Sequence, residues 1–254
     1  MPGGACACQL ASGARAPPER CERGGRAGRS GPERTRPAAK HYDRAVSDER
    51  LSQLARLGSA TVYEAGGRGG YIDLDLHQIV PGSRVAGPAR TVRCGQDDNL
   101  MVHAVIERIE PGDVVVLSMP EPRPVALVGD LLATQAKVAG AAALLIDASV
   151  RDVEELAQMG LPIWARWVRV RGATKTVVGE IDVPVLVGGA RIHPGDIVVL
   201  DADGGAVVEA ARVAEVLAAS LDREEREHVK RAALAAGARS YDLDGLRAVA
   251  EGSA

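Results

Sequence analysis

The stretch VGDLLATQAKVAGAAALLIDASVRDVEEL, residues 128–156, determines the expected fold class of the chain. After the Gly-Asp pair at 129–130, good helix formers fill 133–139 with apolar side chains at helical spacing, and Gly140 closes that helix. The unbroken apolar run 141–146 is too short for a second helix and suits a strand buried on both faces. Polar residues follow, and then a further helical pattern begins. This order of helix, buried strand and helix predicts an α/β fold.

The start of the first of these helices is a candidate anion site. The backbone N–H groups of Leu131, Leu132 and Ala133 have no partners inside the helix. Such a terminus binds small anions, for example a carboxylate. Asp130 stands beside these groups, so its own side chain is the alternative occupant, as a helix cap.

The polar residues after the buried strand are the second half of the candidate site. Arg151 offers a planar fork of donors to a carboxylate or an enolate oxygen, and Asp152 offers hard oxygen to Mg²⁺ or Mn²⁺. Ligands of α/β sheets bind beyond the carboxyl ends of strands. On composition alone, the simpler interpretation is a loop ion pair between Arg151 and Asp152, with Asp130 as a helix cap.

The spacing favours the functional interpretation. Asp130, followed some twenty residues later by Arg151 and Asp152, resembles the RraA-like family, which includes class II pyruvate aldolases acting on 4-hydroxy-4-methyl-2-oxoglutarate and 4-carboxy-4-hydroxy-2-oxoadipate. The resemblance covers residues 46–250. Seven blocks in the family's order carry it, at 60–65, 81–87, 98–103, 129–134, 150–152, 159–164 and 193–196.

The resemblance implies a fold, an activity and an assembly. The fold is a single swivelling β/β/α-type domain with a C-terminal helix. The activity is divalent-metal-dependent retro-aldol cleavage of a 4-hydroxy-2-oxo acid to pyruvate and a second oxo acid, with oxaloacetate decarboxylation as a side activity. Mg²⁺ or Mn²⁺ is the implied cofactor, and a homotrimer or homohexamer is the implied assembly.

The resemblance also assigns roles to residues of this chain. The predicted substrate-binding residues are Gly129, Asp130, Leu131, Leu132, Arg151, Asn99 and His103. Arg151 and Asp130 are the predicted catalytic residues, the first stabilising an enolate and the second helping to reprotonate its methyl carbon. Asp152 is the predicted metal ligand, largely through water, and Glu227 of an adjacent subunit is predicted to reach the same water shell.

The composition limits the other possibilities. The chain has 254 residues and no phenylalanine, so its core must be built from Val, Leu, Ile and Ala, which suits a parallel or mixed sheet covered by Ala-rich helices. A net charge of −3 argues against a general nucleic-acid binder. No apolar run approaches the ~20 residues of a membrane span. A small oxo acid is therefore the expected partner, and a membrane is not.

The predicted domains are a disordered Arg/Gly/Pro-rich tail at 1–44, an α/β domain at 45–210 and a helical segment for subunit contact at 211–254. Residues 1–40 carry a net charge of +5. A transit peptide and a basic nucleic-acid arm remain alternatives for the tail, but an upstream extension without a folded role is preferred. Cys94 is the only cysteine beyond the tail, so a cytoplasmic location is expected.

The rest of the pattern predicts further elements. Helices are predicted at 47–58, 97–107, 153–159 and 211–236. Strands are predicted within 79–93 and at 114–117, 161–170, 183–187, 197–200 and 206–208. Residues 119–127, which contain three prolines, are expected to form an irregular loop that borders the pocket.

Three rival functions are less consistent with the sequence than the aldolase. Some RraA-like proteins bind and inhibit an endoribonuclease, and such a role needs no metal aspartate, so the presence of Asp130, Arg151, Asp152 and Glu227 favours the enzyme. A phosphohistidine carrier needs an exposed nucleophilic histidine, for which His193 in its turn is the only weak candidate. A methyltransferase finds no support, because no glycine-rich strand-to-helix nucleotide motif is present.

Overall fold

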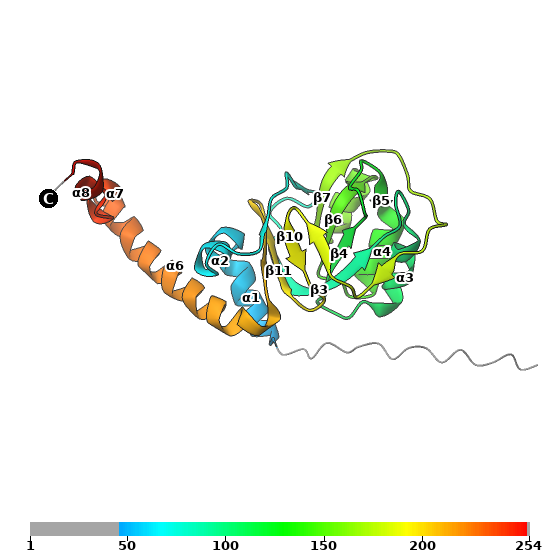
Figure 1. Ribbon diagram of the computed structural model, residues 1–254, viewed down its shortest axis with the longest axis horizontal. Helices are drawn as coiled ribbons and strands as arrows, with labels where there is room; N and C mark the ends of the chain where they lie inside the picture. The colour runs from blue at the N-terminus through cyan, green and yellow to red at the C-terminus, as the bar shows by residue number, and fades with distance from the viewer. Residues whose placement is uncertain (1–45, 253–254) are drawn as a thin grey trace, which may run out of the picture. The chain divides into compact units, whose positions relative to one another are not determined.

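The computed structural model describes residues 46–252, so the predicted tail at 1–44 lies outside the described residues. All the elements below belong to one compact unit, His41–Ala254. The unit is a mixed α/β structure, which confirms the predicted fold class (Figure 1). None of the helices within 46–252 is long and apolar enough to cross a membrane.

The centre of the unit is a ten-stranded sheet with the order β1-β12-β11-β3-β4-β6-β7-β2, in which β5 also pairs with β6 and β8 with β3. Its strands are β1 (Tyr71–Ile72), β2 (His77–Gln78), β3 (Val85–Arg93), β4 (Val114–Ser118), β5 (Ala126–Val128), β6 (Ala143–Val150), β7 (Ile163–Val168), β8 (Glu180–Ile181), β11 (Ile197–Asp201) and β12 (Gly204–Val208). A separate two-stranded sheet is formed by β9 (Val185–Val187) and β10 (Ala190–Ile192). The central pairs β3–β4, β4–β6 and β6–β7 are parallel. Their carboxyl ends therefore meet at one edge of the sheet.

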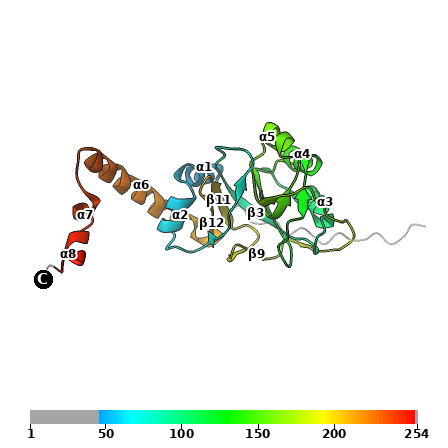
Figure 2. The ribbon, with the colours of Figure 1, turned by 90° about the horizontal axis from the view of Figure 1, so that it is seen from above.

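Helices and a hairpin cover the two faces of these central strands (Figure 2). The helices are α1 (Asp48–Leu57), α2 (Ser59–Ala65), α3 (Leu100–Val105), α4 (Asp130–Val138), α5 (Val153–Met159), α6 (Val213–Ala235), α7 (Ser240–Leu243) and α8 (Leu246–Ala250), with 3-10 turns at Ile106–Arg108 and Ala210–Arg212. Apolar residues of α3, α4 and α5 pack on one face. The antiparallel β9–β10 hairpin packs on the other face, which gives the β/β/α layering.

The core is aliphatic, as the absence of phenylalanine requires. Every residue of β6 is buried, as expected of a parallel strand covered on both faces. Trp164 fills the hairpin side and donates its indole N–H to the Asp201 carbonyl at 2.8 Å. Cys94 packs on the helix side, where burial raises the pKa of its thiol to about 12, with a smaller contribution from nearby Asp98. The cysteine is therefore a packing residue.

Three predicted elements differ from the structure. The buried strand does not end at 146 but runs as β6 to Val150, because its Asp147 is paired with Arg166 at 3.0 Å. Part of the predicted irregular loop at 119–127 forms β5, which pairs with β6. The long C-terminal helix is followed by α7 and α8, which the sequence pattern did not predict.

The first half of α6 packs on α1 and α2, and its second half does not. Val213, Val216, Leu217 and Ser220 are buried against them. Beyond this point α6 extends away from the sheet (Figure 1), and its side chains are largely solvent-exposed. The predicted role of residues 211–254 in subunit contact stays a prediction.

Candidate active site

A pocket of about 130 Å³ opens between the end of β5 and the start of α4. It contains all seven predicted substrate-binding residues. Its lining consists of Asn99, His103, Ala126, Leu127, Gly129, Asp130, Leu131, Leu132, Arg151, Gly172, Ala173 and Lys175. Segments that are far apart in the chain therefore meet at this pocket.

The start of α4 faces this pocket with open donors. Gly129 is the N-cap residue and offers no side chain, and the Asp130 carboxylate accepts no hydrogen bond from this terminus in the described residues. Within residues 46–252, no acceptor is hydrogen-bonded to the N–H of Leu131 or Leu132, whereas the Ala133 N–H, also predicted to be open, donates to the Gly129 carbonyl at 3.1 Å. Two free N–H donors at a helix N-terminus bind a small anion more favourably than they bind water.

Asp152 reaches the same terminus because Gly129 has no side chain. Its Oδ2 atom accepts a hydrogen bond from the Asp130 N–H at 3.3 Å. A Cβ atom on Gly129 would lie only 2.4 Å from that oxygen and 3.2 Å from Arg151 Nε. Asp152 also has a left-handed backbone, with φ 59° and ψ 42°, which is uncommon for a residue with a side chain. Such strain is retained where the surrounding structure requires it, often at functional sites.

Arg151 and Asp152 form the loop ion pair of the simpler interpretation, and Arg151 also lines the pocket. Arg151 Nε lies 3.5 Å from Asp152 Oδ2, and the two side chains are 50% and 35% exposed. An ion pair this exposed contributes little to stability. Both groups therefore remain available to a ligand.

Asn99 presents an unsatisfied acceptor to the pocket. The residue is 7% exposed, and its Nδ2 donates to the Leu127 carbonyl at 2.9 Å. Its Oδ1 is buried without a hydrogen-bond partner. Because buried polar atoms are nearly always paired, this oxygen calls for a ligand or a water molecule.

Lys175 lines the pocket, although nothing in the sequence pattern predicted it. It lies in the irregular segment between β7 and β8, and no motif or spacing marks that segment. The one available signal was its place between Gly172 and Gly179 in a polar loop, which does not fix where the lysine points.

The carboxylates present fit a metal ion that is held mostly by water and substrate. The described part of the chain contains no cluster of three or more His, Cys, Asp or Glu side chains arranged to hold a metal. Asp152 and Asp130 supply two carboxylates, and Mg²⁺ commonly takes one or two carboxylates and keeps several waters. Glu227 lies outside the pocket, on α6, paired with Arg223 at 2.9 Å and Arg231 at 3.1 Å.

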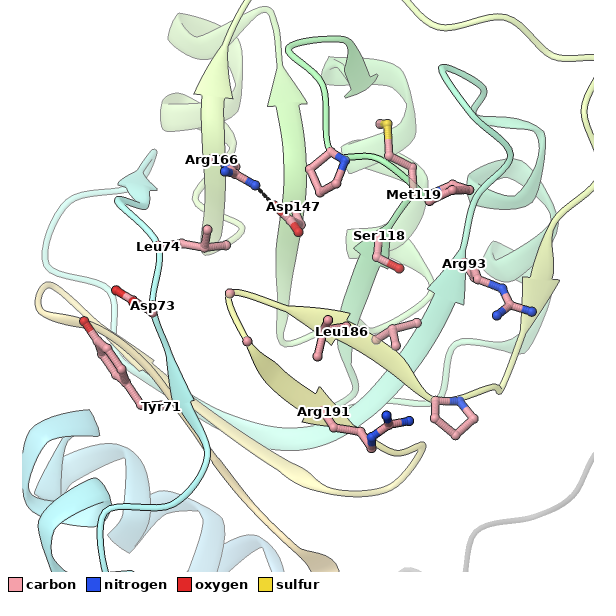
Figure 3. A pocket seen from close by; sticks show the side chains of 16 residues that line it. Tyr71, Asp73, Leu74, Arg93, Ser118, Met119, Asp147, Arg166, Leu186 and Arg191 are labelled. Atoms are coloured by element: carbon pink, nitrogen blue, oxygen red, sulfur yellow. Dashed lines mark hydrogen bonds and ion pairs between the residues drawn. The ribbon is translucent and has the colours of Figure 1, made fainter.

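A larger hollow of about 1010 Å³ lies on the hairpin side of the sheet (Figure 3). Pro120 and Pro122 line this hollow, so this part of the 119–127 loop does not border the pocket as predicted. Asp147 and Arg166 form an ion pair at its wall. Burial raises the pKa of Asp147, and the Arg166 guanidinium opposes that rise. None of the predicted site residues lies in this hollow.

Comparisons with known proteins find one family model and several relatives. A family model named RraA-like and described as Aldolase/RraA matches residues 45–208. A protein of Halalkalibacterium halodurans, provisionally named 4-hydroxy-4-methyl-2-oxoglutarate aldolase, is 33% identical over 151 residues, which are 59% of this chain and 72% of that protein.

Two solved structures are also similar. Streptomyces coelicolor RraAS2, described as an unusual member of the RNase ES inhibitor RraA family, is 31% identical with a TM-score of 0.65, covering 73% of this chain and 97% of that one. A Geobacillus kaustophilus protein described as an S-adenosylmethionine:2-dimethylmenaquinone methyltransferase is 30% identical with a TM-score of 0.55, covering 59% and 93%. The relatives share a fold, and the functions in their descriptions differ.

Proposed function

The chain belongs to the RraA-like family, described as Aldolase/RraA, and on that premise we propose that it is a divalent-metal-dependent aldolase. It cleaves a 4-hydroxy-2-oxo acid into pyruvate and a second oxo acid. The candidate substrates are 4-carboxy-4-hydroxy-2-oxoadipate and 4-hydroxy-4-methyl-2-oxoglutarate. The observation that carries the proposal is that the open α4 amides and Arg151 line one pocket, beside which the Asp152 carboxylate accepts a hydrogen bond from the first N–H of α4.

The α4 terminus orients the substrate. The N–H groups of Leu131 and Leu132 bind the pyruvyl carboxylate, which is favoured by the helix dipole as well as by the two hydrogen bonds. Gly129 permits this close approach. The keto oxygen of the same pyruvyl unit is then directed toward Arg151 and Asp152.

Cleavage places negative charge on that keto oxygen. A water molecule takes the proton of the 4-hydroxyl group, the bond between C3 and C4 breaks, and its electron pair forms the enolate of pyruvate. Arg151 stabilises the enolate oxygen by charge and hydrogen bonding. Asp130, acting through water, returns a proton to C3. Oxaloacetate decarboxylation forms the same enolate, so the pocket serves that reaction too.

Mg²⁺ or Mn²⁺ is the cofactor of this proposal. Asp152 would hold the ion largely through water, and Glu227 of an adjacent subunit would contact the same water shell. When bound, such an ion supplies Lewis-acid polarisation of the keto oxygen. Glu227 lies outside the pocket of its own chain, so it would contact the metal's water shell only from an adjacent subunit. We therefore propose that the protein is a homotrimer or homohexamer. The proposal also includes a cytoplasmic location, since Cys94 is the single cysteine of the described residues.

A non-catalytic role is the second candidate function. The similarity to RraAS2, which is described as a member of an RNase inhibitor family, favours a protein that binds and regulates a ribonuclease. Such a protein needs a docking surface, and it has no need of the open amides, the Gly129 contact or the Asn99 acceptor.

Pyruvate release tests the proposal. The assay couples pyruvate to lactate dehydrogenase and uses both candidate substrates and oxaloacetate, each with Mg²⁺, Mn²⁺ or EDTA. We expect metal-dependent turnover that falls at least about 10²-fold in Asp152→Ala. The matched control is Asp203→Ala, which removes an exposed carboxylate from a turn far along the chain.

Two outcomes contradict the aldolase. Turnover that persists in EDTA and in Asp152→Ala rules out the metal-dependent chemistry. No turnover of any of the three acids, together with inhibition of a ribonuclease, establishes the second candidate function.

A further inference from the structure

Lys175 contributes a positive charge to the pocket that no carboxylate of the described chain neutralises. Its side chain lines the pocket, and no ion pair or hydrogen bond is recorded for its ammonium group within residues 46–252. Arg151, in contrast, is paired with Asp152. The pocket therefore holds one exposed cation that is available to pair with an anionic ligand.

The loop that carries Lys175 is pinned by a buried carboxylate. Asp98 is 0% exposed, and its Oδ2 accepts hydrogen bonds from Thr174 Oγ1 at 2.7 Å, from the Thr176 N–H at 2.6 Å and from the Val177 N–H at 3.0 Å. Burial on its own raises the pKa of Asp98, but these bonds and one from the Leu100 N–H outweigh it and bring the pKa to about 2. The carboxylate therefore stays charged wherever the protein works.

The backbone next to Lys175 is also fixed to the turn before α3. The Thr174 carbonyl accepts from the Asn99 N–H at 2.9 Å, and the Thr174 N–H donates to the Asp97 carbonyl at 3.0 Å. Residues on both sides of Lys175 thus bond to the turn that also places Asn99 in the pocket. These hydrogen bonds anchor the loop on both sides of Lys175, which distinguishes it from a lysine on an unanchored surface loop.

We infer that Lys175 binds the second carboxylate of the substrate, so that the pocket selects dicarboxylic over monocarboxylic 4-hydroxy-2-oxo acids. This inference rests on the proposed aldolase function. The α4 amides take the pyruvyl carboxylate, while the loop after β7 offers a separate cation to the carboxylate on C4. Asp98 is a positioning residue that acts through the loop.

A covalent role for Lys175 is the competing use of the same side chain. A lysine that forms a Schiff base with a carbonyl is activated by desolvation or by a neighbouring cation. Lys175 is exposed, so the desolvation is lacking. Borohydride treatment with pyruvate distinguishes the two, because only a Schiff base leaves a covalent adduct.

The test compares two substrates that differ only at the second carboxylate. These are 4-hydroxy-4-methyl-2-oxoglutarate and 4-hydroxy-4-methyl-2-oxopentanoate, in which a methyl group replaces that carboxylate. In Lys175→Met we expect kcat/KM for the diacid to fall about 10–100-fold, the loss typical of a charge-assisted hydrogen bond, with the monoacid unchanged. Lys175→Arg should restore most of the loss.

Lys137→Met is the matched control. Lys137 is a lysine of α4 whose Nζ donates to the Met159 carbonyl at 2.6 Å, and it does not line the pocket. Its removal should leave the ratio of the two kcat/KM values unchanged. A change as large as that of Lys175→Met would mean that the effect is one of bulk charge.

Exchange of the pyruvate C3 protons with D2O separates the two proposals. Enolisation of pyruvate involves no second carboxylate, so Lys175→Met should exchange at the wild-type rate. Three results would overturn the inference but not the aldolase, provided that the exchange rate stays at the wild-type value. They are an equal fall in kcat/KM for both substrates in Lys175→Met, no fall for either substrate, and a covalent adduct trapped by borohydride. A wild-type protein that neither exchanges nor cleaves overturns both.

Discussion

The pocket at the start of α4 and the hollow on the hairpin side of the sheet are both lined by residues of β6 or its carboxyl end, yet they differ in whether their buried polar groups are paired. In the hollow, Asp147 is paired with Arg166 at 3.0 Å, and Arg93 is paired with Glu180. In the pocket, the α4 amides, the Asn99 Oδ1 atom and the Lys175 ammonium have no such partners among the described residues.

Size is therefore not what favours the pocket as the candidate site. The hollow is several times larger than the pocket, at about 1010 Å³ against about 130 Å³. An unpaired buried acceptor costs stability, so the Asn99 Oδ1 atom favours the pocket as a place where another molecule binds. The buried Asp147 of the hollow, in contrast, is already paired with Arg166.

The largest effect should come from filling the space beside Asp152. In Gly129→Ala, the new Cβ would lie 2.4 Å from Asp152 Oδ2, so the carboxylate must move. A displacement of about 1 Å in an active site can cost about 10²-fold, and we expect that loss in kcat/KM. The backbone of Gly129 is extended, with φ −128°, so alanine adds no backbone strain. Lactate dehydrogenase coupling measures the rate.

Gly69→Ala is the control for this substitution. A Cβ on Gly69 meets nothing within 4 Å, and Gly69 is outside the pocket. Its activity should match the wild type. A Gly129→Ala protein that folds and keeps full activity would show that Asp152 and the α4 terminus are not used together, and the pocket would lose its advantage over the hollow.

Local signals in the sequence predicted much of the fold. The helix 153–159 was predicted with its observed bounds because Gly160 ends it in a left-handed conformation, and α1 was predicted within a residue because Gly58 ends it. The extent of β6 was missed because an aspartate in a buried strand is unfavourable unless paired. Its partner, Arg166, lies on the next strand, and no local pattern reveals such a pair.

The same distinction applies to the candidate site. Gly129 and Asp152 lie 23 residues apart across one βαβ-like turn, so spacing and family resemblance were enough to place them together. Lys175 enters the pocket because its loop bonds to Asp98, which is far away in sequence. Contacts of this kind follow from the tertiary fold and not from periodicity, so local sequence patterns could not predict them.

An intermediate effect is expected in the hollow, and on stability rather than activity. Burial raises the folded-state pKa of Asp147 above the usual 3.8. The free energy of unfolding therefore falls as the pH rises from the unfolded-state pKa through the folded-state pKa, because the carboxyl group ionises more readily in the unfolded chain. Arg166→Met removes the partner that limits this rise in the pKa. The free energy of unfolding should fall by about 1–3 kcal/mol at pH 7 and by less at pH 4, where Asp147 binds a proton.

Urea denaturation at the two pH values measures this difference, and Asp147→Asn in the same protein should remove its pH dependence. The kcat/KM value should stay within about twofold of the wild type, because Arg166 shares no hydrogen-bond or ion-pair network with the pocket residues in the described part of the chain and distant sites act nearly independently. An equal loss of stability at pH 4 and pH 7 would show that Arg166 acts through packing on Trp167, whose ring lies 4.4 Å from its guanidinium carbon, instead of through Asp147.

The smallest effect should come from the rim of the hollow. Arg93 and Glu180 form an ion pair whose side chains are 49% and 51% exposed, and pairs this exposed are typically worth about 0.2–1 kcal/mol. Arg93→Gln should therefore change the free energy of unfolding by at most about 0.5 kcal/mol, and less at high salt, which screens exposed charges. Urea denaturation at two salt concentrations checks this. If instead the substitution abolished turnover while the protein stayed folded, Arg93 would contact a ligand, and the hollow would have to be counted as part of the active site despite its internally paired charges.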